Sequence, residues 1–156
     1  MQLFDQKHPG YASQLVLQDR LDQVAHAICP TEIQRNAHDF FTPQPESNRG
    51  ARAYYLHSII HDYDDSHALK ILQHLKDAML PGYSKLLIHD VLIPPRKASR
   101  RDTSVDVHMM AKLGGRERTE DMLLGLVKRL GFHVRKIWRS DCSEKSILEA
   151  ELPLLS

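Results

Sequence analysis

The order of strand-like and helix-like segments is the feature that most constrains the fold of this chain. Four short blocks, rich in apolar or aromatic residues and bounded by Gly, Pro, Asp or Asn, are typical of buried strands. They are QLVLQ (14–18), ARAYYLHSII (51–60), KLLIHDVLI (85–93) and HVRKIWR (133–139). Helical patterns lie between them, and this alternation predicts an α/β fold with a mainly parallel sheet, in which ligands bind at the carboxyl ends of the strands.

Two of the intervening segments have apolar residues at helical spacing together with start and stop signals. In DDSHALKILQHLKDAMLPG, Asp65 or Ser66 is the predicted N-cap, and in RTEDMLLGLVKRLGF the predicted cap is Thr119 and the end is Gly131. A weaker helix is predicted over about 20–28. The apolar faces consist of Ala68, Leu72, Leu75 and Met79 in the first segment, and of Met122, Leu123, Leu126, Val127 and Leu130 in the second.

Composition excludes several classes of function. The 156 residues have the size of one domain, predicted over 1–156, and 21 Lys and Arg against 20 Asp and Glu give no charge excess for nucleic acid or an anionic membrane. The two cysteines, Cys29 and Cys142, form no CxxC pattern, which fits a reducing compartment rather than a disulfide scaffold or zinc site. No apolar run is long enough to span a membrane and MQLFDQKHPG has no signal region. Small-molecule chemistry in the cytosol is therefore the expectation.

The stretch HSIIHDYDDSH (57–67) contains three histidines and three aspartates. Within it, His61 and Asp62 lie where a predicted central strand ends and a helix begins, a position at which α/β folds place reactive groups. A polar residue there is often only a helix cap, and residues 64–66 fit that role better than catalysis. An adjacent His–Asp pair also marks a class of metal-dependent phosphohydrolases. Those enzymes are helical throughout, whereas predicted strands flank the pair here.

Two further acids occupy comparable positions: Asp90 near the end of the third predicted strand and Glu117 in the turn GGRERTE. A histidine between two carboxylates is a sensible general base, because one carboxylate holds the ring N–H while the other ring nitrogen takes a proton. The alternatives are a surface or helix-dipole charge for Glu117 and a turn residue for Asp90. Asp19 and Asp39 also follow strand ends, where a carboxylate can accept hydrogen bonds from ribose hydroxyls.

Five stretches in a fixed order match a known pattern: HPGYASQLVLQDRLDQV, AHDFFTPQP, ARAYYLHSIIHDYDD, LPGYSKLLIHDVLIP and VDVHMMAKLGGRERTEDM. With them, nearly the whole chain resembles the carboxyl-terminal part of metal-independent, S-adenosylmethionine-dependent O-methyltransferases of the plant caffeate type and their fungal secondary-metabolism relatives. The resemblance implies a Rossmann-like class I methyltransferase sheet. It also implies methyl transfer to a phenolic hydroxyl of a small aromatic or polyketide-like substrate, without a metal.

The same resemblance implies roles for individual residues. His61 is the implied proton acceptor, flanked by Asp90 and Glu117. Asp19 is implied to bind the ribose of the methyl donor.

Asp39 and Phe40 are implied to lie near the adenosine part of the donor, and Met109 and Met110 belong to the segment that clamps the substrate in relatives. Two positions depart from the family pattern. Tyr63 replaces a tryptophan that packs near the adenine, and it keeps an aromatic face, so stacking is expected to survive in weakened form. His57 stands where relatives carry Lys or Arg, and a near-neutral imidazole cannot supply their fixed charge.

The largest departure is an absence. Relatives have an amino-terminal helical dimerisation and substrate domain, then a strand and a Gly-rich turn around the donor, but no GxGxG-like segment occurs in this sequence. The sheet is therefore expected to be truncated at its amino end and to lack its first strand, which lies between the strands at 14–18 and 51–60. Unpaired strand groups cost about 1–3 kcal/mol each when buried.

Three explanations of the missing strand remain open. The two edges close on each other, another polypeptide supplies the strand, or the chain is a fragment, a shortened product or a mispredicted gene model. A homo-oligomer or a partner chain that carries the amino-terminal half is the corresponding expectation. The alternative function is a non-catalytic methyltransferase remnant that acts as a binding or partner subunit or is inactive.

Overall fold

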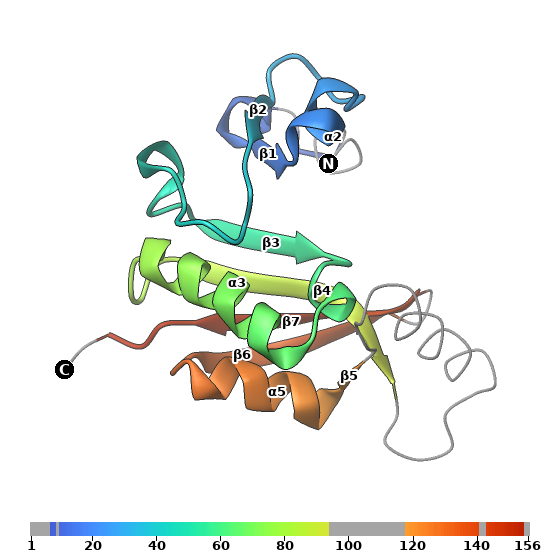
Figure 1. Cartoon of the computed structure of the whole chain (residues 1–156), viewed down its shortest axis with the longest axis vertical. Helices are drawn as coiled ribbons and strands as arrows, with labels where there is room; N and C mark the ends of the chain where they lie inside the picture. Colours follow the sequence, from blue (N-terminus) through green and yellow to red (C-terminus); the bar gives the residue numbers. More distant parts are fainter. Residues whose placement is uncertain (1–6, 9, 94–117, 141–142, 155–156) are drawn as a thin grey trace. The chain divides into compact units, whose positions relative to one another are not determined.

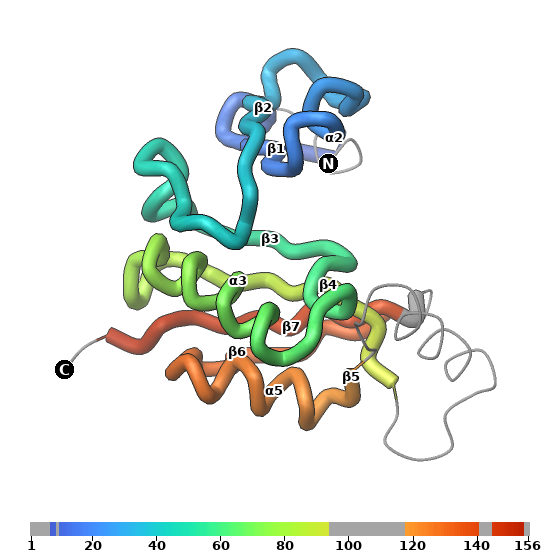
Figure 2. Tube along the Cα trace, viewed as in Figure 1, coloured from blue at the N-terminus to red at the C-terminus, as the bar shows by residue number. Residues whose placement is uncertain are grey.

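The chain forms two compact units, Met1–Thr42 and Pro43–Ser156. The computed structural model describes residues 7–8, 10–93, 118–140 and 143–154, and Figure 2 traces them through both units. The expectation of a single domain over 1–156 stays a prediction.

The first unit contains a small parallel sheet. Its elements are the 3₁₀ turn η1 (Ala12–Gln14), strand β1 (Val16–Asp19), helix α2 (Leu21–Ala25) and strand β2 (Gln34–Ala37). β1 and β2 pair in parallel from Val16 with Gln34 to Asp19 with Ala37. Helix α2 is shorter than the predicted segment over 20–28. Val24 is its one buried residue, while Leu21 and Ile28 are exposed, so no core contact supports a longer helix.

The second unit is a sheet with helices on one face (Figure 1). The strand order is β3-β4-β7-β6, with β5 paired to the end of β4. Its elements are η2 (Glu46–Asn48), β3 (Ala53–His57), η3 (Ile60–Asp62), α3 (Asp65–Ala78), β4 (Lys85–Ile93), β5 (Arg118–Thr119), α5 (Glu120–Arg129), β6 (His133–Ser140) and β7 (Ser143–Glu151).

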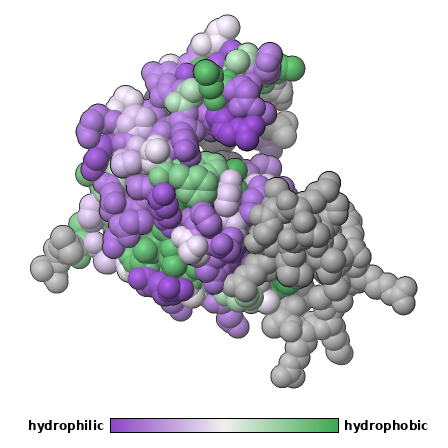
Figure 3. Space-filling model, viewed as in Figure 1, coloured by the Kyte–Doolittle hydropathy of each residue, from purple (hydrophilic) through white to green (hydrophobic). Residues whose placement is uncertain are grey.

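The core of this unit lies between the sheet and the two helices. Strand β4 alternates buried and half-buried residues, so Leu86 and Ile88 face the helices. The predicted apolar face of α3 is confirmed as buried, whereas in α5 Met122 is 36% exposed. The buried residues of α5 are Leu123, Leu126 and Val127. Figure 3 shows mostly hydrophilic residues on the outer side of these helices, with hydrophobic patches between them.

Two details of the predicted sheet are corrected. The sheet is mixed rather than mainly parallel, because β7, which was not predicted, pairs antiparallel with both β4 and β6. The strand before His61 is not central, since β3 is the outermost strand of the described sheet. Strands β1 and β3 belong to different sheets.

The helix caps differ in part from the prediction. Asp64, rather than Asp65 or Ser66, caps α3 by accepting a hydrogen bond from the backbone N–H of His67 at 2.9 Å and another from the Ser66 hydroxyl at 2.8 Å. These hydrogen bonds, led by the His67 N–H, hold the pKa of the Asp64 carboxyl well below its usual range. Thr119 caps α5 as predicted.

Replacing Thr119 by alanine is expected to lower the free energy of unfolding by about 1 kcal/mol. The reason is that the Thr119 hydroxyl accepts a hydrogen bond from the Met122 N–H at 3.3 Å, and alanine leaves that donor without this partner. Urea unfolding followed by circular dichroism measures the change. The control is Thr119→Ser, which keeps the hydroxyl and should retain most of the stability. Equal losses in both variants would contradict a capping role.

Candidate active site

His61 lies in a short turn between β3 and α3. After β3 ends at His57, the backbone of Ser58 takes a left-handed conformation (φ 55°), and its N–H bonds the carbonyl of His89 at 3.0 Å. Ile60 is fully buried and anchors the turn η3 that carries His61. The His61 side chain is only 16% exposed. The candidate base is therefore held at the carboxyl end of the sheet with little contact with solvent.

His61 and Asp90 line the same small cavity, together with Arg118. Asp90 is 5% exposed and lies on β4, where the period of two places it on the same face as Leu86 and Ile88. The structure thus brings together the predicted base and one of its two predicted carboxylates. The other, Glu117, lies outside the described residues, as do Met109 and Met110.

A carboxylate that was not assigned to the base also lies beside His61. The Asp62 Oδ1 atom is 3.4 Å from the Nε2 atom of His61, and the Asp62 side chain is 32% exposed. Asp62 is therefore a second carboxylate close to the candidate base, beside Asp90. The adjacent position in the sequence was visible, but adjacency alone does not indicate that the two side chains meet.

The predicted donor-binding acids lie at the carboxyl edge of the sheet in the first unit. Asp19 is the last residue of β1, and its carbonyl accepts the N–H of His38, one residue before Asp39. An Asp39 carboxylate oxygen accepts the N–H of Phe41 at 2.9 Å, and the Phe40 and Phe41 rings meet edge to face at 5.1 Å. Two carboxylates at the ends of neighbouring parallel strands, with an aromatic residue beside them, fit the hydroxyls and base of a nucleoside.

Tyr63 lies in the second unit, directly after the turn that carries His61. Its ring centroid is 6.5 Å from that of His67, and its backbone carbonyl accepts a hydrogen bond from Arg118 at 2.8 Å. Stacking of Tyr63 near an adenine stays a prediction.

A lysine supplies a fixed charge beside His57. The Nζ atom of Lys145 on β7 is 3.0 Å from Nε2 of His57 and donates to the Ser58 hydroxyl at 2.6 Å. An ammonium only donates, so Nε2 is the acceptor and the ring proton sits on Nδ1. Burial and then Lys145 lower the pKa of His57, and the same two causes lower the pKa of His89, 4.8 Å away between ring centroids. Both shifts favour the neutral form of the ring.

Two features of the described residues bear on the other classes of function. No helix in the described part of the chain is long and apolar enough to cross a membrane. Within the described ranges, no three His, Cys, Asp or Glu side chains are grouped closely enough to hold a metal ion. The expectation that activity needs no metal stays a prediction.

Comparison with known proteins gives one consistent family. The family model described as an O-methyltransferase domain matches residues 16–133. The O-methyltransferase mfmE of Annulohypoxylon moriforme is 44% identical over 149 residues, which are 96% of this chain and 37% of that protein.

Solved structures agree with this match. A protein described as a pericyclic reaction enzyme aligns with a TM-score of 0.87 and 28% identity over 96% of this chain and 39% of its own. LepI in complex with SAM aligns with a TM-score of 0.86 and 27% identity over the same shares of the two chains. The chain thus spans little more than a third of the length of these similar proteins.

Proposed function

The chain belongs to the O-methyltransferase family, whose methyl donor is S-adenosylmethionine, and on that premise we propose that it carries the general base of a methyl transfer to a hydroxyl group. The acceptor we propose is the phenolic hydroxyl of a small aromatic or polyketide-like metabolite. The observation that carries the proposal is the placement of His61 and Asp90 on one cavity at the carboxyl end of the sheet.

The chemistry assigned to His61 is proton removal. A phenol with a pKa near 10 is a poor nucleophile at pH 7, and an imidazole can take its proton as the oxygen attacks. Asp62, 3.4 Å from the ring, and Asp90, on the same cavity, favour the protonated ring that results. When bound, S-adenosylmethionine supplies the electrophilic methyl group. In this proposal Asp19 and Asp39 accept hydrogen bonds from its ribose, and Phe40, in the same unit, offers an aromatic face to its adenine.

The test is a product analysis. The chain is combined with a polypeptide that supplies the amino-terminal part of a relative such as mfmE, and the mixture is incubated with S-adenosylmethionine and a panel of phenols. Mass spectrometry should show a phenol that gains one methylene unit while S-adenosylhomocysteine forms in equal amount. Failure of every phenol, with full occupancy of the donor site shown by calorimetry, would remove the proposed acceptor class.

A second candidate function is pericyclic catalysis, favoured by the likeness to the pericyclic reaction enzyme. A pericyclic reaction reorganises bonds without a methyl donor, so no S-adenosylhomocysteine forms, and a unimolecular one gives a product with the mass of its substrate. The same mass measurement separates the two candidates. The 44% identity to an O-methyltransferase, against 28% to the pericyclic enzyme, supports methyl transfer as the first choice.

Activity is expected to be unchanged by chelation of divalent metals. In the proposed mechanism, His61, Asp62 and Asp90 move or stabilise a proton. They are not used as metal ligands, and no step of the reaction requires a metal. Turnover measured with and without EDTA should agree within error, and added Mg²⁺ or Zn²⁺ should not raise it. Loss of turnover in EDTA that Mg²⁺ restores would contradict the proposal and favour a metal-dependent reaction.

A further inference from the structure

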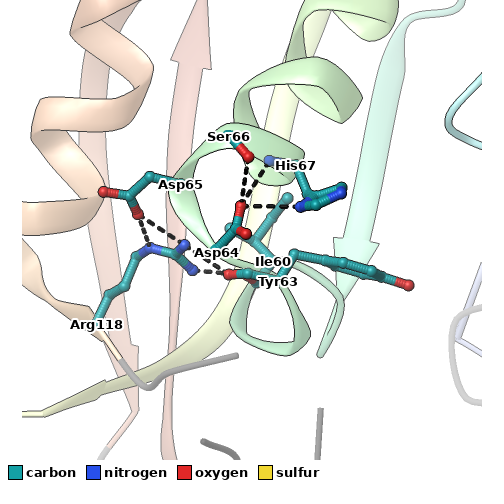
Figure 4. Close-up of polar contacts among 7 residues, drawn as sticks. All are labelled: Ile60, Tyr63, Asp64, Asp65, Ser66, His67 and Arg118. Atoms are coloured by element: carbon teal, nitrogen blue, oxygen red, sulfur yellow. Dashed lines mark hydrogen bonds and ion pairs between the residues drawn. The ribbon is translucent and has the colours of Figure 1, made fainter. Parts of the chain in front are cut away.

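Arg118 is a buried arginine that lines the same cavity as His61 and Asp90. It belongs to β5, pairs with Leu92 at the end of β4, and is 3% exposed. Its guanidinium donates to the carbonyl of Ile60 at 2.7 Å, to the carbonyl of Tyr63 at 2.8 Å and to the Asp65 carboxylate at 2.9 and 3.3 Å (Figure 4). One side chain therefore provides four hydrogen bonds to the segment that contains His61.

The acceptors of Arg118 define what this side chain holds in place. Ile60 and Tyr63 stand on either side of the pair His61–Asp62, and Asp65 is the first residue of α3. The backbone of the turn is fixed on both sides of the candidate base, and it is fixed relative to β4, the strand that carries Asp90. Arg118 therefore links the turn that carries His61 to the strand that carries Asp90.

Arginine suits this position for a physical reason. Its planar guanidinium has five N–H donors in a rigid fork, so it can satisfy two carbonyls and a carboxylate at once while remaining charged. Lysine offers a single donor atom, which cannot reach three acceptors in different directions with the same geometry. Charge-assisted hydrogen bonds of this kind are also shorter and stronger than neutral ones.

We propose that Arg118 is a positioning residue that sets the orientation of the His61 ring by clamping the turn on both sides of it. The inference rests on the proposed function of His61 as the base. Arg118 itself is not the proton acceptor in this proposal, because a guanidinium has only N–H donors and no acceptor atom.

The experiment uses nuclear magnetic resonance on the full chain with Arg118→Met, which keeps the length of the side chain and removes its donors. The amides of Asp62 and Tyr63, which bond the carbonyls of Ile59 and Ile60, should exchange with solvent roughly tenfold faster or more. The ring ¹⁵N resonances of His61 should move as well. Core amides of Leu72 and Ile88 should change far less, which separates loosening of the turn from loss of global stability.

The matched control is Arg139→Met, since Arg139 pairs with Glu120 from a position that is 62% exposed. It should leave the His61 resonances and the turn amides unchanged. Arg118→Lys should restore part of the wild-type pattern. If Arg118→Met does not fold, Asp65→Asn replaces it, because this side chain is 39% exposed and the change removes its negative charge while it keeps an acceptor oxygen. Unmoved His61 resonances in Asp65→Asn and Arg118→Lys would then overturn the inference.

A kinetic measurement separates this inference from the proposed function. In the active assembly, Arg118→Met should lower kcat while the KM for the methyl donor stays near the wild-type value. If no methyl transfer is found with any acceptor, the proposed function fails, and the resonance experiment still decides whether Arg118 orients the ring. If methyl transfer is found and Arg118→Met leaves both kcat and the His61 resonances unchanged, Arg118 is not a positioning residue.

Discussion

Replacement of His61 by alanine is expected to lower the turnover of the active assembly by roughly 10²–10⁴. The expected loss is that of a general base, because alanine cannot take the proton of the attacking hydroxyl. Donor affinity should stay nearly unchanged, since the acids assigned to the donor are Asp19 and Asp39. Steady-state kinetics give kcat, and calorimetry with S-adenosylhomocysteine gives donor affinity, so the two contributions are measured separately.

His67→Ala is the matched control for this variant. His67 stands in the same stretch of the sequence, but its side chain is 56% exposed and its ring contacts the α3 cap Asp64 at 3.0 Å. Its loss should leave kcat within about threefold, since a surface change at a helix end affects stability more than chemistry. If His61→Ala and His67→Ala had the same kcat as the parent, His61 would have no part in the mechanism.

The position of the candidate base could be predicted because it follows from local patterns. A strand-like block before HD and a helical pattern after it place His61 at a strand-to-helix junction. Asp90 follows from the period of two in KLLIHDVLI, in which Leu86, Ile88 and Asp90 share one face. The caps were predicted less well. Asp64, Asp65 and Ser66 are all capping residue types, and only the geometry shows that Asp64 accepts the His67 N–H.

Contacts between distant residues could not be predicted in this way. Arg118 bonds the carbonyl of Ile60, 58 positions away, and Lys145 approaches His57 from 88 positions away. Neither lysine nor arginine carries a local signal of burial, because both are found mostly at the surface. From the sequence alone, His57 indicates the loss of the positive charge that relatives carry at this position. In the structure, the ammonium of Lys145 on β7 lies beside His57.

Strand β7 was missed for a related reason. SEKSILEAE has few apolar residues, and only Leu148 and Ala150 among its described hydrophobic side chains are fully buried. It forms a strand because β4 and β6 pair with it on both sides. Tertiary pairing of this kind outweighs a weak local preference for strand. The mixed sheet follows from that one strand, since the β3–β4 pair is parallel as predicted.

A polypeptide of these 156 residues alone is expected to bind S-adenosylmethionine weakly. Its affinity should be one to several orders of magnitude lower than that of an assembly with the amino-terminal part of a relative. In Rossmann-like sites, a glycine-rich turn lets backbone N–H groups approach the ligand closely, and no GxGxG-like segment occurs in this sequence. Asp19 and Asp39 can hold the nucleoside end of the donor. A few missing hydrogen bonds at its methionine end, at about 0.5–1.5 kcal/mol each, account for the expected loss.

Calorimetry with S-adenosylhomocysteine measures this affinity on the chain alone and after addition of the amino-terminal fragment, while light scattering gives the mass of each species. Asp19→Asn should weaken the remaining affinity further. The matched control is Asp22→Asn, because Asp22 is an exposed acid in the same unit that pairs with Arg20. Equal affinities for these two variants would remove Asp19 from the donor site.

The masses from light scattering test a separate prediction, which concerns self-association of the chain. β3 is the outermost strand of the described sheet, and an edge strand is a template for pairing with another chain. We therefore expect the chain alone to self-associate, and we expect the supplied fragment to replace self-association by a defined complex that binds the donor. A stable monomer that binds S-adenosylhomocysteine with micromolar affinity by itself would show that the donor site is complete within these residues. The acids at the ends of β1 and β2 would then hold the donor without a glycine-rich turn.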